Sequence, residues 1–391
     1  AKEDQYAAVM VEGGTVLVTM KWKHPMETAE VVELFKALPA SEVGVVMESS
    51  GRYGDAIRAQ LENAGLEVYL VSAKRVHDAA EVYDGVPSMH DAKAAAIIAK
   101  LHFDGATRHW PEMSEERRSL AAAVSTMEMF AGQYQRNLNR LEAELARAWP
   151  EITQEIALDS ATLLRLIAAY GAPRIMAMRP KLVRELFGRV SGSLLKEQKR
   201  ERILELAGTT IGVRLVDEER ESLKHLAQEI LRNRRELAKA KKRVEELGQS
   251  DETIKNMSST VGKTTAAVLS VRVGDPRIYE SVGAYVKAYG LGLKERSSGK
   301  SKGQLRITKR GPGDARQYLW MAVLRLIQWN PHFRAWYARK VARDGGQHKG
   351  KAVVALMRKL VAGLWHVGHG KPFEARLLFD ESRLGLVTGG R

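Results

Sequence analysis

Two stretches of the chain carry apolar residues at alternating spacings of three and four, and these stretches constrain the fold most. They fall within residues 111–150 and 215–250. The first seam consists of Leu120, Val124, Met127, Ala131, Tyr134, Leu138, Leu141, Leu145 and Ala148. The second consists of Leu223, Leu226, Ile230, Asn233, Leu237, Ala240, Val244 and Leu247. About four heptads in each stretch predict long coiled-coil helices, paired with each other or across subunits.

One position on the second seam is polar. Asn233 is expected to fix the register or the number of partners, at some cost in stability. Ordinary bundle helices are the alternative interpretation of both stretches.

The segment before the helices, residues 1–110, alternates strand-like and helix-like patterns. Residues 5–22 predict a hairpin around Glu12-Gly13-Gly14, and the apolar runs Val43–Met47 and Leu66–Val71 predict strands. Asp91–Phe103 predicts an alanine-rich helix. The overall fold class is therefore α/β plus all-α, with a layered sheet at the N-terminus.

Two carboxylates occupy positions where such sheets carry function. Glu48 ends the first short strand, and Asp91 opens the helix that follows. Brought together, they could bind Mg²⁺, which takes oxygen ligands and retains water for a phosphate substrate. The alternative is structural: Asp91 would complement the helix N-terminus, and Glu48 would be a solvated strand-end residue.

The remaining segments are expected to be helical. Residues 151–214 form an Arg- and Lys-rich insertion that suits contact with a nucleic-acid backbone or a plain spacer. Residues 251–391 read as a compact helical domain that presents one loop. Its expected helices include Asp314–Trp329, Pro331–Arg343 and Gly350–His366.

That loop, Tyr289–Arg316, places Ser297 and Ser298 among many cations. The cations are Lys287, Lys294, Arg296, Lys300, Lys302, Arg306, Lys309, Arg310 and Arg316. A serine needs its proton removed and the resulting charge stabilised before it can attack. Guanidinium groups bind phosphate oxygens in a planar fork, so arginines around a serine suit attack on a phosphodiester. A flexible basic loop that only touches phosphates is the alternative.

Charge and cysteine content narrow the partners. The formal net charge is +15 and the pI about 9.8, which points to nucleic acid as the partner. No run of apolar residues is long enough to span a bilayer. The absence of cysteine excludes disulfides and thiolate metal sites and fits a reducing cytoplasm.

The order of several motifs resembles the DEDD-type insertion-sequence transposases. These motifs are MESSGRYG, HDAKAAAIIA, STVGKTTAAVL, YGLGLKERSSG and GHGKPFEARLLFD. The resemblance covers nearly the whole chain except the insertion. It implies a RuvC-like, ribonuclease-H-type N-terminal domain with an acidic Mg²⁺ site, and a C-terminal domain whose serine becomes a covalent phosphoserine.

Residue by residue, the resemblance assigns Glu48 to the second acidic position of the family and Asp91 to the fourth. Ser298 matches the nucleophile, with Ser297 as the alternative. The first aspartate falls two residues before Ala1, and Ser88 stands where the family has the third. Asp84 could substitute for Ser88, because a hydroxyl is a weak Mg²⁺ ligand.

The family further implies a bacterial, cytoplasmic recombinase guided by a structured bridge RNA, which pairs with target and donor DNA. The coiled coil would mediate subunit assembly, and dimers would assemble as tetramers. We expect Arg296 to act with Ser298 in catalysis. We expect the DNA-contacting cations to be Lys294, Lys300, Lys302, Arg306, Lys309 and Arg310.

Two other functions remain open from the sequence. The acidic domain alone could hydrolyse DNA as a metal-dependent junction nuclease, with the serine loop as a clamp. Alternatively, the chain could be a non-catalytic nucleic-acid-binding scaffold, since the acidic set is incomplete.

Overall fold

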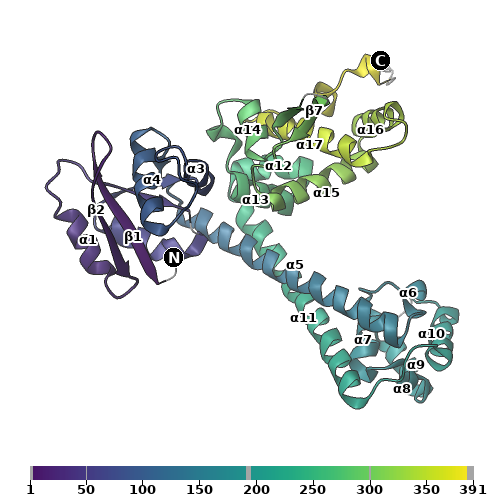
Figure 1. Cartoon of the computed structure of the whole chain (residues 1–391). Coiled ribbons are helices and arrows are strands. Elements are labelled where there is room, and N and C mark those ends of the chain that lie inside the picture. The colour runs from purple at the N-terminus through teal and green to yellow at the C-terminus, as the bar shows by residue number, and fades with distance from the viewer. Residues whose placement is uncertain (1–2, 50, 191–194, 299–300, 385–391) are drawn as a thin grey trace. The chain divides into compact units, whose positions relative to one another are not determined.

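The computed structural model describes residues 3–49, 51–190, 195–298 and 301–384, with the backbone alone described at 296–298, 301, 302 and 304. The chain divides into two compact units, Ala1–Met113 and Ser114–Arg391. Figure 1 shows the elements of each unit.

The N-terminal unit is an α/β domain, as expected. Its elements are β1 (Asp4–Val11), β2 (Thr15–Lys23), α1 (Thr28–Lys36), β3 (Gly44–Glu48), a 3-10 turn (Gly51–Gly54), α2 (Asp55–Asn63), β4 (Glu67–Val71), α3 (Ala73–Asp78), α4 (Asp91–Phe103) and β5 (Arg108–His109). β1 pairs antiparallel with β2, while β3 and β4 are parallel and β5 joins β4 antiparallel.

The expected single sheet is therefore divided in two. The described strands form a two-stranded sheet, β1–β2, and a three-stranded sheet, β3–β4–β5. Ala7 and Met20 of the hairpin nevertheless pack in the same apolar cluster as Val45 and Met47 of β3. The two sheets thus share a core without sharing a hydrogen-bond ladder.

The second unit is built on two long helices, α5 (Glu115–Ala148) and α11 (Asp217–Gly248), which pack along each other. The end of α5 meets the start of α11 through Leu141, Leu145 and Leu223. Near the other end, Val124 and Val244 lie in one cluster, so the pair is antiparallel. The seam residues are thus paired within one chain.

The insertion forms a helical subdomain at the junction of the two long helices (Figure 1). Its helices are α6 (Ile152–Glu155), α7 (Ala161–Tyr170), α8 (Pro173–Ala177), α9 (Pro180–Val190) and α10 (Glu197–Thr209). Trp149, Leu163 and Phe187 are fully buried in its core.

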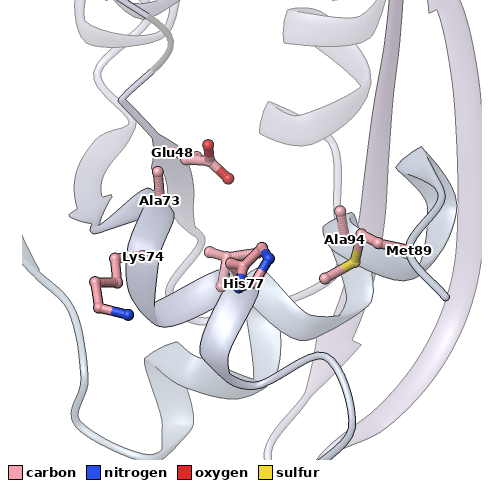
Figure 2. Close-up of a pocket in the computed structure, with 7 residues that line it drawn as sticks. Glu48, Ala73, Lys74, His77, Met89 and Ala94 are labelled. Atoms are coloured by element: carbon pink, nitrogen blue, oxygen red, sulfur yellow. The ribbon is translucent and has the colours of Figure 1, made fainter. Parts of the chain in front are cut away.

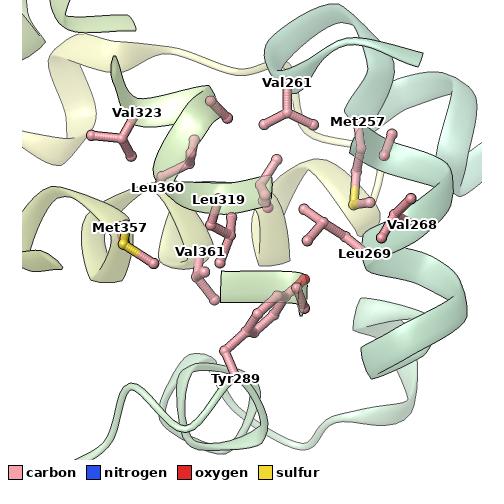
Figure 3. Packing of buried hydrophobic residues seen from close by; sticks show 14 of the residues in the cluster. Met257, Val261, Val268, Leu269, Tyr289, Leu319, Val323, Met357, Leu360 and Val361 are labelled. Atoms are coloured by element: carbon pink, nitrogen blue, oxygen red, sulfur yellow. The ribbon is translucent and has the colours of Figure 1, made fainter. Parts of the chain in front are cut away.

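The C-terminal part is a helical domain with one β-hairpin. Its elements are α12 (Glu252–Val261), α13 (Lys263–Val273), α14 (Val282–Ala288), β6 (Leu293–Ser298), β7 (Ser301–Ile307), α15 (Gly313–Trp329), α16 (Pro331–Arg343) and α17 (Lys349–Gly368), with 3-10 turns at Pro276–Ile278, Ala375–Leu378 and Glu381–Arg383. Asp251 and Asn330 cap α12 and α16 with side-chain oxygens. Leu319, Tyr289 and Leu360 are fully buried in its core (Figure 3).

No helix in the described ranges combines the length and apolar character needed to cross a membrane.

Candidate functional site

The first candidate site lies where β3 and β4 end in the N-terminal unit. The strands are parallel, and Glu48 is the register partner of Val71, so both strands end at one edge of the sheet. Functional groups of α/β sheets gather at this edge. Glu48 is half-buried there.

Glu48 lines an open hollow of about 550 Å³ (Figure 2). Its other lining residues are Ala73, Lys74, Val76, His77, Met89 and Ala94. Met89 and Ala94 bracket Asp91 in sequence, so the segment that carries Asp91 borders the hollow opposite Glu48. The structure thus places the segments of the two expected acidic residues around one space.

Asp91 is the first residue of α4 and is exposed, while Ser88 is exposed just before that helix. The His90 ring caps the helix by accepting the Lys93 backbone N–H at 3.2 Å. Neither Glu48 nor Asp91 forms an ion pair with any described residue. Both carboxylates therefore remain open to an external cation.

Asp84, the alternative to Ser88, has a different role. Its carboxylate lies 2.8 Å from Nζ of Lys93, whose side chain is largely buried. The Lys93 hydrogen bond, aided by the Val86 N–H, lowers the pKa of Asp84. Lys93 also donates to the Val86 carbonyl at 2.6 Å, so the pair fixes the segment ahead of Ser88.

No group of three or more metal-binding side chains occurs among the described residues. Mg²⁺ is commonly held by one or two carboxylates together with water and substrate phosphates. Glu48 and Asp91 match that ligand number, which suits an ion bound jointly with a nucleic acid. They do not form a complete protein-only site.

Lys74 and His77 were not expected at this hollow. They belong to α3, which begins directly after the end of β4. Glu48 is at the corresponding end of the neighbouring strand β3. Their side chains line the hollow, and Lys74 also pairs with Asp78 at 2.6 Å. The parallel pairing of the strands was the signal that could have placed α3 beside Glu48.

The second candidate site is the serine stretch, which is a β-hairpin and not the loop that its composition predicted. β6 and β7 pair antiparallel, with Lys294 opposite Arg306 and Ser298 opposite Ser301. The register shifts between Arg296 and Ser298. Backbone pairing across the two strands overrides the linker-like Ser, Gly and Lys content.

Several expected site residues can be placed only by their backbone. Ser298 is the last residue of β6, Ser297 and Arg296 precede it, and Lys302 lies in β7. Lys300 lies outside the described residues. The pairing of Ser298 with Ser301 sets the candidate nucleophile beside the turn of the hairpin.

The described cations of the hairpin are exposed. Lys294, Arg306, Lys309 and Arg310 form no ion pair with any described side chain. Lys294 and Arg306 are also direct cross-strand partners. Like charges directly opposite each other destabilise an antiparallel pair, so this arrangement is suited to a bound polyanion.

Comparison with known protein families gives two matches. The family described as "Transposase", of the DEDD IS110 type, matches residues 1–150. The family described as "Transposase IS116/IS110/IS902 family" matches residues 254–338. No curated protein matches the chain. The first match contains Glu48 and Asp91, and the second contains the serine hairpin; the chain belongs to the DEDD-type transposases of the IS110 family.

Proposed function

We propose that this transposase cuts and rejoins DNA through a covalent phosphoserine at Ser298, with a structured guide RNA selecting the DNA sites. The observation that carries the proposal is the pairing of Lys294 with Arg306 in the hairpin whose first strand ends at this serine. Two facing cations favour a bound DNA backbone, and Ser298 lies on the same strand four residues further along, roughly 13 Å away.

The register supports a shared face. Side chains alternate along a strand, so positions 294 and 296 are expected on one side of β6, ahead of the register shift that precedes Ser298. Arg306 faces Lys294 across the ladder. Arg296, Arg306 and Arg310 are our candidates to neutralise the charge that develops on the phosphate.

The chemistry balances without a co-reactant. The Ser298 oxygen attacks phosphorus, an O–P bond forms, and the ester bond to the leaving strand breaks. The serine proton ends on the hydroxyl of that leaving strand. Attack by a hydroxyl of another strand reverses the step, joins the two strands and releases the serine.

Glu48 and Asp91 are the residues that would hold Mg²⁺. The ion would supply Lewis-acid stabilisation of phosphate charge. Ser88 would contribute a hydroxyl or a bridging water to the same site. The net charge of +15 accommodates guide RNA and DNA together. We further propose that dimers assemble into tetramers on the DNA.

The test is capture of the protein–DNA adduct. Protein with its co-purifying RNA is incubated with matching DNA, denatured, and analysed by gel and mass spectrometry. Wild-type protein should carry a nucleotide on Ser298, and Ser298→Ala should carry none. Ser297→Ala serves as the matched control and should still form the adduct. Loss of the adduct in Ser297→Ala but not in Ser298→Ala would make Ser297 the nucleophile.

A junction nuclease without a serine intermediate is the second candidate. It is favoured by Glu48, which lines the hollow, and by the exposed Asp91, whose sequence neighbours Met89 and Ala94 line it. Under that function, Glu48→Gln abolishes cleavage while Ser298→Ala cleaves normally, and no adduct forms at any time. Absence of strand breakage with any divalent metal would instead indicate a binding scaffold.

A further inference from the structure

Two chain segments, or legs, lead into and out of the serine hairpin: residues 289–292 before β6 and residues 308–311 after β7. They lie against each other, and we call this contact the neck. The Lys309 N–H donates to the Gly290 carbonyl at 2.8 Å, and the Thr308 N–H donates to the Gly292 carbonyl at 2.8 Å. Just before the neck, Tyr289 is fully buried, with its hydroxyl 2.9 Å from that of Tyr285. The segment that enters the hairpin is therefore anchored in the core at Tyr289.

Arg316 lies in the first turn of α15 and contacts both chain segments of the neck. Its Nη1 lies 3.1 Å from the Tyr289 carbonyl oxygen and 2.8 Å from that of Gly311. Tyr289 precedes the hairpin and Gly311 follows it. One guanidinium group thus bridges the two ends of the segment that carries Ser298.

The packing at the neck leaves little freedom. A Cβ on Gly311 would lie 2.3 Å from the Ala288 carbonyl oxygen, and a Cβ on Gly290 would lie 2.9 Å from Nη1 of Arg316. Gly290 has φ +70° and Lys309 has φ +56°, both in the left-handed region. The legs cross backbone to backbone, so a shift of one leg must move the other.

We propose that Arg316 is a positioning residue, which fixes the orientation of the serine hairpin on the helical core. The sequence places Arg316 among the cations around the two serines, but its Nη1 is directed to two protein carbonyls. Charge-assisted bonds to these carbonyls are stronger than neutral ones. The inference rests on the proposed function for its catalytic consequence, whereas its structural part concerns the neck alone.

The test compares Arg316→Ala and Arg316→Lys with wild-type protein. Amide hydrogen exchange at Thr308 and Lys309 in the DNA-free protein should accelerate about tenfold or more in Arg316→Ala, because bonds to a charged group are lost. The rate of adduct formation should fall about tenfold or more for the same reason. DNA affinity and its salt dependence should be unchanged, and added guanidinium should restore part of the rate.

Arg316→Lys keeps the charge and provides a variant with a conservative change if Arg316→Ala does not fold. Its Nζ ends one bond short of the position of the arginine Nη1 and cannot reach both carbonyls in the same geometry, so exchange at the neck should still accelerate. Arg339→Ala, which removes an exposed arginine from α16, is the charge-matched control and should leave exchange at the neck unchanged.

Two results would overturn the proposal. One is unchanged exchange at Thr308 and Lys309 in both Arg316 variants. The other is a salt slope that falls by about one in Arg316→Ala, which would make this residue a phosphate ligand. Failure of the proposed function looks different, because wild-type protein would then give no adduct while the exchange result at the neck would stand.

Discussion

Nε of Arg272 in α13 lies 2.6 Å from Oδ2 of Asp314, in the first turn of α15. The same guanidinium group donates to Glu128 of α5. The three side chains are only 24–35% exposed, which strengthens their interaction relative to surface pairs. Arg272 therefore ties the helix that carries Arg316 to one of the two long helices.

Replacing Arg272 with Met should destabilise the second unit by about 2 kcal/mol, because two partly buried carboxylates would lose their shared cation. Chemical unfolding followed by circular dichroism measures the change. Arg243→Met is the control, since Arg243 is mostly exposed and lies 3.8 Å from Glu246. A loss below about 0.5 kcal/mol is expected there, and equal losses in both variants would contradict the assignment.

Gly311→Ala should disrupt the neck of the serine hairpin, since its Cβ would lie 2.3 Å from a backbone oxygen. We expect a local cost of about 2–4 kcal/mol and faster amide exchange at the neck. Gly313→Ala is the matched control, because its Cβ would meet only an Arg316 side-chain nitrogen at 3.6 Å. Indistinguishable exchange profiles for the two variants would argue against a tight neck.

Lys294→Gln should act in opposite directions on stability and on DNA binding. Removing one of two facing cations should stabilise the DNA-free protein by about 0.5 kcal/mol. It should also weaken DNA binding and reduce the salt slope by about one. Lys36→Gln on α1, where the lysine pairs with Glu33, is the control. An unchanged salt slope for Lys294→Gln would show that Lys294 does not contact a DNA phosphate.

The Asp84 carboxyl should titrate below the ordinary range of aspartate. The pKa of Asp84 is lowered mainly by the Lys93 hydrogen bond. A lowered folded pKa contributes stability that is present above the ordinary value and is lost as pH falls through the folded pKa. NMR titration of the Asp84 carboxyl should show a low midpoint, which Lys93→Met moves upward. The same midpoint in both proteins would exclude the lysine as the cause.

Asn233→Leu should stabilise the packed pair of long helices. Asn233 is 2% exposed, and its Oδ1 has no hydrogen-bond partner among the described residues. Removing an unsatisfied buried polar group at a seam position should raise stability by about 1 kcal/mol. Asn139→Leu, at an exposed position, should change stability by less than about 0.5 kcal/mol. Destabilisation by Asn233→Leu would mean that its amide is bonded in solution.

The long periodic elements were predictable from sequence. The helix expected over Asp91–Phe103 has those bounds, and so does Pro331–Arg343, where Asn330 caps the first turn. Their limits are set by local signals, namely an acidic first residue and a Pro after a capping residue. Both long helices were likewise visible, because their apolar spacing is sustained over many turns.

The hairpin at Ser298 was missed because its sequence opposes strand formation locally. Its Ser, Gly and Lys content is typical of linkers, and its facing cations repel each other. Its legs are instead held from outside, by the buried Tyr289 and by Arg316. Contacts between positions 289, 311 and 316 depend on tertiary packing, which no local pattern encodes. The same holds for Lys74 and His77 beside Glu48.

The packing of α5 against α11 has a consequence for how copies of this protein can meet. Leu141, Leu145 and Leu223 already face one another inside a single chain. A neighbouring molecule approaching along these helices would encounter mainly hydrophilic outer surfaces. Contact there would be electrostatic and sensitive to ionic strength, unless two molecules opened and exchanged helices. Self-association through α5 and α11 would thus be weak and salt-dependent if the outer surfaces meet. It would be slow if two molecules exchange these helices.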